Sequence, residues 1–302
     1  MSISSFVPFF LLATVLSFSA QEIAGFHKVK VGATEVIAIQ DGEVKLKPEL
    51  LQGIKPADAQ AMLGSGEPVP TSVNAFLVRT GKHLVLVDAG GAATAAYGNS
   101  LGHVVEHLRK AGVEPESIEA VLITHLHFDH VGGLITPDGQ RAFPKAQIRL
   151  AQAEYDYWMD PALEAQADDH RKAMLKIVKA ALAPYMLAGA LHPFAPGEAP
   201  FPGVTAMPLP GHTPGHTAYV FGSGKDAVWM IGDSVHFAKV QFPHPEVSVS
   251  FDTDSAKAIA SREELFGRAA KQGVVLAGAH IAFPGMGRVV AQGNGFKWLP
   301  VK

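Results

Sequence analysis

The 302-residue chain contains no cysteine, so disulfides and thiolate metal ligands are excluded, and any metal must be bound by His, Asp or Glu. Charge is also sparse: 25 Lys and Arg residues stand against 28 Asp and Glu residues, and no basic run is present. Binding a nucleic-acid backbone needs a concentrated positive surface. We therefore expect no nucleic-acid partner.

The N-terminal apolar run, Phe6–Phe18, is too short to span a membrane, since a spanning helix needs roughly 20 apolar residues. Ser19-Ala20-Gln21 follows it, and we expect residues 1–20 to be a secretory signal peptide or, alternatively, a hydrophobic N-terminal arm. Cleavage predicts a periplasmic or secreted protein, and an uncleaved segment predicts a cytoplasmic one. Residues 21–302 contain no linker or low-complexity segment and are expected to form one domain.

After residue 25, short strand patterns alternate with helical patterns, and Gly and Pro separate them. The expected strands are His27–Val31, Glu35–Gln40, Val73–Arg79, Leu84–Asp88, Ala120–Ile123, Val204–Leu209, Ala218–Phe221, Ala227–Ile231 and Gly273–Ala277. The expected helices are Leu101–Lys110, Pro161–Leu182 with a break at Pro184, and Ser255–Lys271 with Asp252 or Asp254 as its cap. Strand pairs followed by helices, twice over, predict an α/β fold. We expect a four-layer αββα sandwich with two sheets inside and helices outside.

Metal-ligand side chains are concentrated directly after the expected strand Ala120–Ile123. The run Thr124-His125-Leu126-His127-Phe128-Asp129-His130 contains three histidines and one aspartate. Imidazole nitrogens and carboxylate oxygens are suitable ligands for zinc, iron, manganese or cobalt. The run therefore predicts a metal site at the end of a buried strand.

Three further ligand-type residues stand where later strands are expected to end. His216 closes the segment Pro210–His216, Asp233 follows the strand Ala227–Ile231, and His280 follows the strand Gly273–Ala277. Loops at strand ends bring distant segments to one site, because the sheet holds their backbones in place. Together with the first run this makes seven ligands, which exceed the four of a tetrahedral zinc. They suit two metals that share a carboxylate and a water molecule.

The order and spacing of these residues resemble the metallo-β-lactamase superfamily of hydrolases over nearly all of the chain after residue 25. The resemblance implies two divalent metal ions, zinc first, with manganese, cobalt or iron as alternatives. It implies that His125, His127 and His216 bind the first metal, that Asp129, His130 and His280 bind the second, and that Asp233 bridges both. His212 is then expected to have a structural role or to contact a metal ligand instead of the metal, and direct participation at the metal site stays open as the alternative.

Features of this chain narrow the reaction within the superfamily. The absence of cysteine excludes the zinc β-lactamases that use an Asp-Cys-His site, and His127 stands where the flavodiiron oxidoreductases have Glu. The RNA-processing members carry basic nucleic-acid-binding elements that this sequence lacks. Hydrolysis of a small molecule remains. The implied mechanism is attack by a metal-bridging hydroxide, with Asp129 passing on a proton.

Later segments resemble the methyl parathion hydrolase group and its lactonase and aryl-esterase relatives; these segments are Gly232–His236, Val240–Val247, Phe251–Ser255 and Gly295–Val301. Acyl-homoserine lactonases usually carry Tyr three residues after the bridging aspartate, where this chain has His236. We expect His236 either to assist catalysis or to pack beside the metals. The expected substrate-pocket residues are Tyr97, Trp158, Met174 and Phe237, with ordinary core packing as the alternative for each.

The sequence thus predicts a dinuclear metal-dependent hydrolase of lactones and aryl esters that also hydrolyses organophosphate triesters such as methyl parathion and paraoxon. The expected substrate is small and neutral, because the predicted pocket is aromatic rather than basic. The alternatives are an acyl-homoserine lactonase, a glyoxalase II-like thioesterase, and a metal-binding protein without hydrolytic activity. The family resemblance also suggests a homodimer.

Overall fold

The computed structural model describes residues 24–92 and 100–301, which contain two large β-sheets. The seven-stranded sheet consists, in spatial order, of β1 (Phe26–Val31), β2 (Thr34–Leu46), β4 (Val69–Thr80), β5 (His83–Val87), β6 (Ala120–Leu122), β7 (Gln147–Ala151) and β8 (Leu191–Phe194). The six-stranded sheet consists of β15 (Gly295–Pro300), β14 (Met286–Gln292), β13 (Val275–Ala277), β11 (Val228–Met230), β10 (Thr217–Phe221) and β9 (Val204–Pro208). A third, two-stranded sheet pairs β3 (Leu51–Gln52) with β12 (Ser248–Val249).

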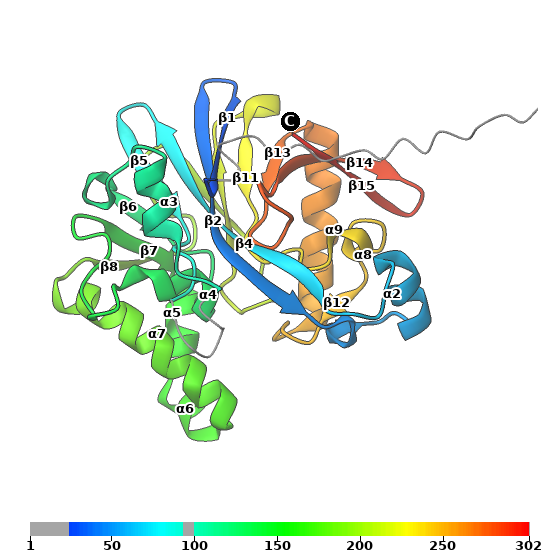
Figure 1. Ribbon diagram of the computed structural model, residues 1–302, viewed down its shortest axis with the longest axis horizontal. Coiled ribbons are helices and arrows are strands. Elements are labelled where there is room, and N and C mark those ends of the chain that lie inside the picture. Colours follow the sequence, from blue (N-terminus) through cyan, green and yellow to red (C-terminus); the bar gives the residue numbers. More distant parts are fainter. Residues whose placement is uncertain (1–23, 93–99, 302) are drawn as a thin grey trace, which may run out of the picture.

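Helices cover the outer face of each large sheet (Figure 1). On the first sheet they are α3 (Val104–Lys110), α4 (Phe128–Val131), α5 (Gln152–Met159) and α7 (Asp169–Leu187), with α6 (Pro161–Gln166) beside α7. On the second sheet the covering helix is α9 (Ser255–Gln272). Two short helices, α2 (Pro56–Leu63) and α8 (Ala238–Gln241), enclose a small separate core.

Neighbouring residues of the central strands face different cores. In β4, Ala75 and Leu77 pack under the helices of the first half, whereas Phe76 packs between the two sheets. In β11, Met230 packs between the sheets and Trp229 packs toward α9. Because side chains alternate along a strand, a sheet buried on both faces needs the continuous apolar runs seen in this sequence. The order helix, sheet, sheet, helix confirms the predicted four-layer αββα sandwich.

The expected helix Pro161–Leu182 differs from the structure, which has two helices there. The chain turns at Asp168, whose side chain accepts a hydrogen bond from the backbone N–H of Arg171 and so caps α7. The predicted break at Pro184 is wrong, since α7 continues through it to Leu187. Pro184 lies in the last turn, where the missing N–H removes only one helical hydrogen bond close to the end of the helix.

The structure shows which of the two candidate aspartates caps α9. Asp254 accepts a hydrogen bond from the backbone N–H of Lys257 at 3.1 Å, which makes it the N-cap. Asp252 instead points its carboxylate toward His212. One of the two aspartates therefore supports the helix and the other supports the candidate site.

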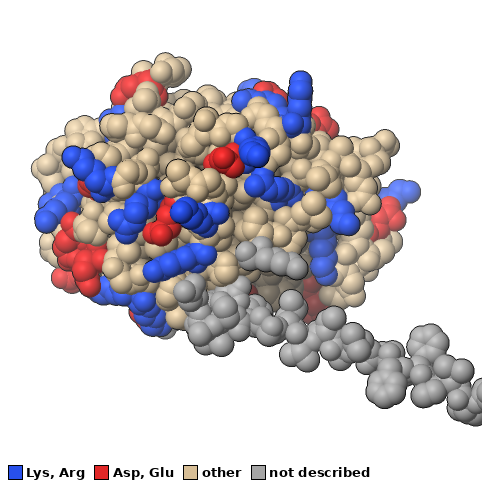
Figure 2. Space-filling model, turned by 90° about the horizontal axis from the view of Figure 1, so that it is seen from above, with Lys and Arg blue, Asp and Glu red and all other residues tan. Residues whose placement is uncertain are grey.

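Two predictions fall on residues outside the described ranges. The expected signal peptide, residues 1–20, and the expected pocket residue Tyr97 both lie there and stay predictions. Within residues 24–92 and 100–301, no helix is both long enough and apolar enough to cross a membrane. On the face shown in Figure 2, basic and acidic side chains are interspersed among wide uncharged areas.

Candidate metal centre

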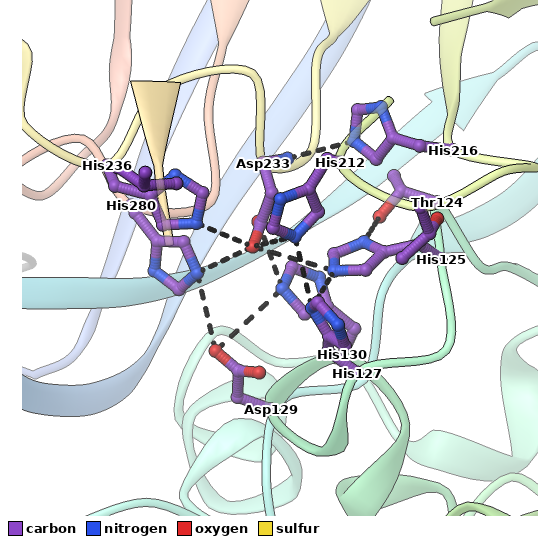
Figure 3. Close-up of polar contacts among 12 residues, drawn as sticks. Thr124, His125, His127, Asp129, His130, His212, His216, Asp233, His236 and His280 are labelled. Carbon is purple, nitrogen blue, oxygen red and sulfur yellow. Dashed lines mark hydrogen bonds and ion pairs between the residues drawn. The ribbon is translucent and has the colours of Figure 1, made fainter. Parts of the chain in front are cut away.

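The candidate ligands lie on loops that follow strands of both large sheets. The loop after β6 carries the cluster that begins at His125, the loop between β9 and β10 carries His212, and β11 and β13 lead into Asp233 and His280. Because β11 and β13 are parallel, their carboxyl ends lie at the same edge of the sheet. The fold thereby brings residues more than 100 positions apart in the sequence into one cluster (Figure 3).

The first group of ligand atoms comes from His125, His127, His212 and Asp233. Nδ1 of His127 lies 2.9 Å from Nε2 of His125 and 3.0 Å from Nε2 of His212. Oδ2 of Asp233 lies 3.5 Å from Nε2 of His125 and 3.3 Å from Nε2 of His212. Three imidazoles and one carboxylate are a suitable set for a four-coordinate divalent ion.

The second group comes from Asp129, His130 and His280, with Asp233 shared between the groups. Nε2 of His280 lies 3.3 Å from Oδ2 of Asp129 and 3.1 Å from Oδ2 of Asp233. Nε2 of His130 lies 3.0 Å from Oδ1 of Asp233. Figure 3 shows the carboxylate of Asp233 between the two sets of rings, in the position of a bridging ligand.

Metal ions fit this arrangement better than hydrogen bonds alone. Nδ1 of His127 faces two imidazole nitrogens, although a ring nitrogen has only one proton or one lone pair to offer. Nε2 of His130 and Oδ1 of Asp233 are buried and lie 3.0 Å apart as an ion pair, but neither atom has a hydrogen-bond partner among the described residues. Buried polar atoms without a hydrogen bond are costly, and a cation held between these two would satisfy both. The residues therefore suit two divalent metals that share Asp233.

Electrostatics also favour cations here. Burial, reinforced by the charge of His130, holds the pKa of His125 well below its ordinary value, and burial with His212 does the same to the pKa of His127. Both rings are therefore neutral and can offer lone pairs. At His280, burial lowers the pKa, but Asp233 and Asp129 outweigh it and raise the pKa to about 10. The two carboxylates thus strongly stabilise positive charge at this position.

His216 belongs to neither group, so its predicted place on the first metal is corrected to His212. Nε2 of His216 accepts the backbone N–H of Asp233 at 3.0 Å, and its Nδ1 lies 3.1 Å from the carbonyl oxygen of Leu209. Both ring nitrogens are therefore engaged with the backbone, and Figure 3 shows the ring set apart from the other candidate ligands. His212 and His216 share one loop, and spacing alone does not reveal which of them faces the centre.

Outer carboxylates orient the ligand rings. Asp88, which has a left-handed backbone with φ 59°, accepts the backbone N–H of Thr124 at 2.8 Å and lies 2.8 Å from Nδ1 of His130. Asp252 lies 2.9 Å from Nδ1 of His212, and the buried guanidinium of Arg262 lies 3.7 Å from its second oxygen. A ring held at Nδ1 presents Nε2 to the metal, and such partners fix both the tautomer and the ring orientation.

A cavity of about 930 Å³ opens onto the candidate metal centre. Residues of the centre form its floor; these are His127, Asp129, Asp233, His236 and His280. Its apolar walls are formed by Val44, Leu46, Phe128, Trp158, Met174 and Phe251. Charged side chains at the walls include Lys45 and Arg171. A mainly apolar cavity with a few polar groups at one end is the usual form of a small-molecule site.

Of the predicted pocket residues that the structure describes, two line the cavity and one does not. Trp158 and Met174 line the cavity, and the ring of Trp158 stands edge-on to His127 with centroids 5.6 Å apart. The prediction of Phe237 as a pocket residue is wrong, because Phe237 packs in the small core under α8 with Val240 and is absent from the cavity lining. Although Phe237 directly follows His236, its apolar side chain packs into the core beneath the loop.

His236 lies at the floor of the cavity, next to both carboxylate and imidazole ligands. Its Nε2 is 3.1 Å from Oδ2 of Asp233, and its ring stacks on His280 with centroids 5.0 Å apart. Its Nδ1 is buried and has no hydrogen-bond partner among the described residues. The side chain is therefore close enough to the centre to contact a bound substrate.

Several residues at the site have no clear sequence signal. Arg171 lines the cavity from α7, far in the sequence from the ligand motifs. Asp252 was expected only as a helix cap, and Glu154 in α5 was not singled out, although its buried carboxylate contacts both ligand loops. Acidic residues near helix starts are common, so only their contacts in the folded chain distinguish these two.

Comparison with known proteins gives consistent results. The family described as the metallo-β-lactamase superfamily matches residues 68–280. An N-acyl homoserine lactonase of Bacillus sp. is 25% identical over 218 residues, which cover 66% of this chain and 78% of that protein. The crystal structure of hydrolase AbOPH in the β-lactamase superfamily is 33% identical with a TM-score of 0.86, and covers 92% of this chain and 98% of that one. AidC, a dizinc quorum-quenching lactonase in complex with a product, is 26% identical with a TM-score of 0.80 and the same coverage of 92% and 98%.

Proposed function

Because the chain belongs to the metallo-β-lactamase superfamily and is a metal-dependent hydrolase, we propose that it hydrolyses lactones, with N-acyl homoserine lactones as the first class to test. The observation that carries the proposal is the cavity, whose apolar walls end at Asp129, Asp233 and His236. A neutral ring ester with an apolar chain matches both ends of such a cavity. The similarity to N-acyl homoserine lactonases over 218 residues supports the same class.

The metals are proposed to be zinc, in line with the dizinc lactonase to which the chain is similar. His125, His127 and His212 would hold one ion, Asp129, His130 and His280 the other, and Asp233 would bridge them. When bound, such ions polarise an ester carbonyl and lower the pKa of a water molecule toward neutrality.

The protein's own groups then orient the substrate and move protons. Asp129 lines the cavity and has its Oδ2 near His280, so its carboxylate is placed to take a proton from the attacking water. His236 lies 3.1 Å from Asp233, and we assign it to hydrogen bonding with the ester oxygen that gains negative charge. The walls formed by Trp158 and Phe251 would hold the apolar part of the substrate and exclude water.

A second candidate activity is hydrolysis of neutral aryl esters and organophosphate triesters. It is favoured by the resemblance of the segments Gly232–His236 and Phe251–Ser255 to the methyl parathion hydrolase group. A triester phosphorus and a lactone carbonyl both develop negative charge on oxygen when attacked, so one centre can serve both reactions. Three of the four residues of Phe251–Asp254 line the cavity, which makes this segment a determinant of the substrate.

The test is a comparison of kcat/KM on four substrates: N-hexanoyl homoserine lactone, dihydrocoumarin, paraoxon and S-lactoylglutathione. The expected order places a lactone first and the glutathione thioester last. Preference for paraoxon would move the second candidate to first place, and preference for S-lactoylglutathione would overturn the proposal in favour of a thioesterase. Removal of metal with a chelator should abolish all turnover, and added zinc should restore it.

A further inference from the structure

Glu154, in the first turn of α5, is a fully buried carboxylate that accepts four hydrogen bonds. Its Oε1 accepts the backbone N–H of Leu126 at 2.9 Å and the indole N–H of Trp158 at 2.7 Å. Its Oε2 accepts the hydroxyl of Thr213 at 2.6 Å and the backbone N–H of Gly215 at 3.0 Å. Oε1 therefore bonds to the loop after β6 and to α5 itself, and Oε2 bonds to the loop between β9 and β10.

Three of these partners belong to the two loops that carry the histidines of the first group. Leu126 lies between His125 and His127, and Thr213 directly follows His212. One carboxylate thus joins a loop of the first half of the sandwich to a loop of the second half. The approach is close: a Cβ at Gly215 would lie 2.2 Å from the backbone nitrogen of Glu154, so only glycine fits there.

The hydrogen bonds favour the ionised form of Glu154. The N–H groups of Leu126, Trp158 and Gly215 can only donate, and the hydroxyl of Thr213 can donate as well, so a carboxylate satisfies all four partners. Burial raises the pKa of Glu154, and the hydrogen bonds from Thr213 and Leu126 oppose that rise. Within residues 24–92 and 100–301, no Lys or Arg nitrogen lies within 4.0 Å of this carboxylate. The nearest concentration of positive charge would be the metal centre itself, in the loops that Glu154 holds.

Trp158 adds a third connection. Its indole N–H is held by Glu154, and its ring stands edge-on to His127 at 5.6 Å while forming part of the cavity wall. A shift of Glu154 would therefore move a ligand loop and a substrate-contacting ring together.

We propose that Glu154 is a positioning residue that holds the loops of His125, His127 and His212 in register across the two halves, and so sets the affinity of the first metal. The proposal rests on the proposed metal-dependent hydrolysis. It assigns no contact between Glu154 and either the metal or the substrate. The second group, Asp129, His130 and His280, has none of the four hydrogen bonds and is expected to be nearly independent of Glu154.

Glu154→Gln is the sharpest variant because it keeps the shape and removes the charge. Its amide group is best accommodated toward Thr213, since a hydroxyl can turn to accept a hydrogen bond. The same orientation places N–H against N–H at Gly215, which weakens the loop of His212 while the bonds to Leu126 and Trp158 persist.

The experiment titrates purified full-length protein with zinc in competition with a chromophoric chelator. For Glu154→Gln we expect one of the two ions to bind about 10- to 100-fold more weakly, with the other unchanged, because removal of an outer partner has effects of that size. At saturating zinc the KM for the lactone should stay the same, since the cavity wall is preserved. Equal zinc affinities in a folded Glu154→Gln and the wild type would overturn the proposal.

Two further variants keep the test decisive. Thr213→Val removes one donor and is expected to weaken the same ion by a smaller factor; if Glu154→Gln does not fold, an unchanged zinc affinity in Thr213→Val overturns the proposal instead. Tyr185→Phe is the matched control: it removes buried hydrogen bonds to Phe143 and Leu134, and Tyr185 shares none of the four partners of Glu154. It should lower stability without changing zinc affinity.

Because the zinc titration needs no substrate, it tests the role of Glu154 separately from the proposed hydrolysis of lactones. Wild type that binds two ions but does not hydrolyse lactones would contradict the proposed substrate and leave the role of Glu154 intact. Wild type that binds no zinc would overturn both.

Discussion

Nε2 of His212 lies 3.0 Å from Nδ1 of His127, although the two residues are 85 positions apart in the sequence. Each ring comes from a different half of the sandwich, and Asp233 lies 3.3 Å from the same nitrogen of His212. The first metal would thus be bound across the interface between the two halves. Its binding should couple the halves, because ligands from both must stay in place.

The first prediction separates the two histidines of one loop. His212→Ala should lose one metal ion and lower kcat by more than the roughly 100-fold that loss of an outer partner costs. His216→Ala should keep two ions, because both ring nitrogens of His216 are bonded to the backbone of Asp233 and Leu209, but it should lose about 1–3 kcal/mol of stability through unpaired buried groups. Metal analysis, kinetics and denaturant unfolding measure these outcomes. Loss of an ion in His216→Ala with both ions kept in His212→Ala would reverse the assignment.

The second prediction concerns His236. His236→Phe keeps a ring that can stack on His280 and removes the hydrogen bond near Asp233. We expect kcat for a lactone to fall on the order of 100-fold, the effect of losing one donor to a developing oxyanion, with KM and metal content retained. An unchanged kcat would identify His236 as a packing residue.

The third prediction tests the apolar wall. Phe251 is 39% exposed in a cavity-lining position, and its ring lies 5.7 Å from that of His236. Phe251→Ala should raise the KM of a long-chain acyl lactone about fivefold, since loss of about 1 kcal/mol of apolar contact is expected for a partly exposed ring. The effect should shrink as the chain is shortened. Leu187→Ala, at an apolar residue that is 89% exposed at the end of α7, is the control and should leave KM unchanged.

The fourth prediction concerns pH and stability. Burial raises the pKa of Asp41 from 3.8 to about 6, against hydrogen bonds from the backbone N–H groups of Gly91, Gly102, Val104 and His103. Since the folded-state pKa lies above the unfolded value, the contribution of this group to stability is present below about pH 4 and is lost as pH rises through 6.

Asp41→Asn cannot titrate and provides the reference. The difference in unfolding free energy between wild type and Asp41→Asn should fall by about 2 kcal/mol between pH 4 and pH 7, because each pKa unit corresponds to about 1.4 kcal/mol and part of the effect already lies below pH 4. Guanidinium unfolding of both metal-free proteins measures it, and titration of the remaining groups cancels in the difference. Parallel stability curves would show that the carboxyl of Asp41 does not titrate in this range.

Much of the fold follows from local pattern. Continuous apolar runs such as Leu84–Val87 predict strands buried on both faces, and the amphipathic segment after Asp254 predicts a helix on an outer face. The strands β14 and β15 were not predicted, because their exposed Val290 and Leu299 blur the alternation on which such predictions depend. The long extension of β2 to Leu46 was missed for a related reason: Gly42 lies at an irregularity in the pairing with β4 and interrupts the pattern.

The sequence by itself determined the chemistry of this protein. The absence of cysteine left only nitrogen and oxygen ligands, and the dense run from His125 to His130 marked the centre, because ligands that are close in sequence stay close in any fold. Only the tertiary structure decided which histidine of the β9–β10 loop faces that centre, and that Glu154 contacts both ligand loops. Those choices depend on ring orientation and on contacts between distant strands, which a linear pattern does not contain.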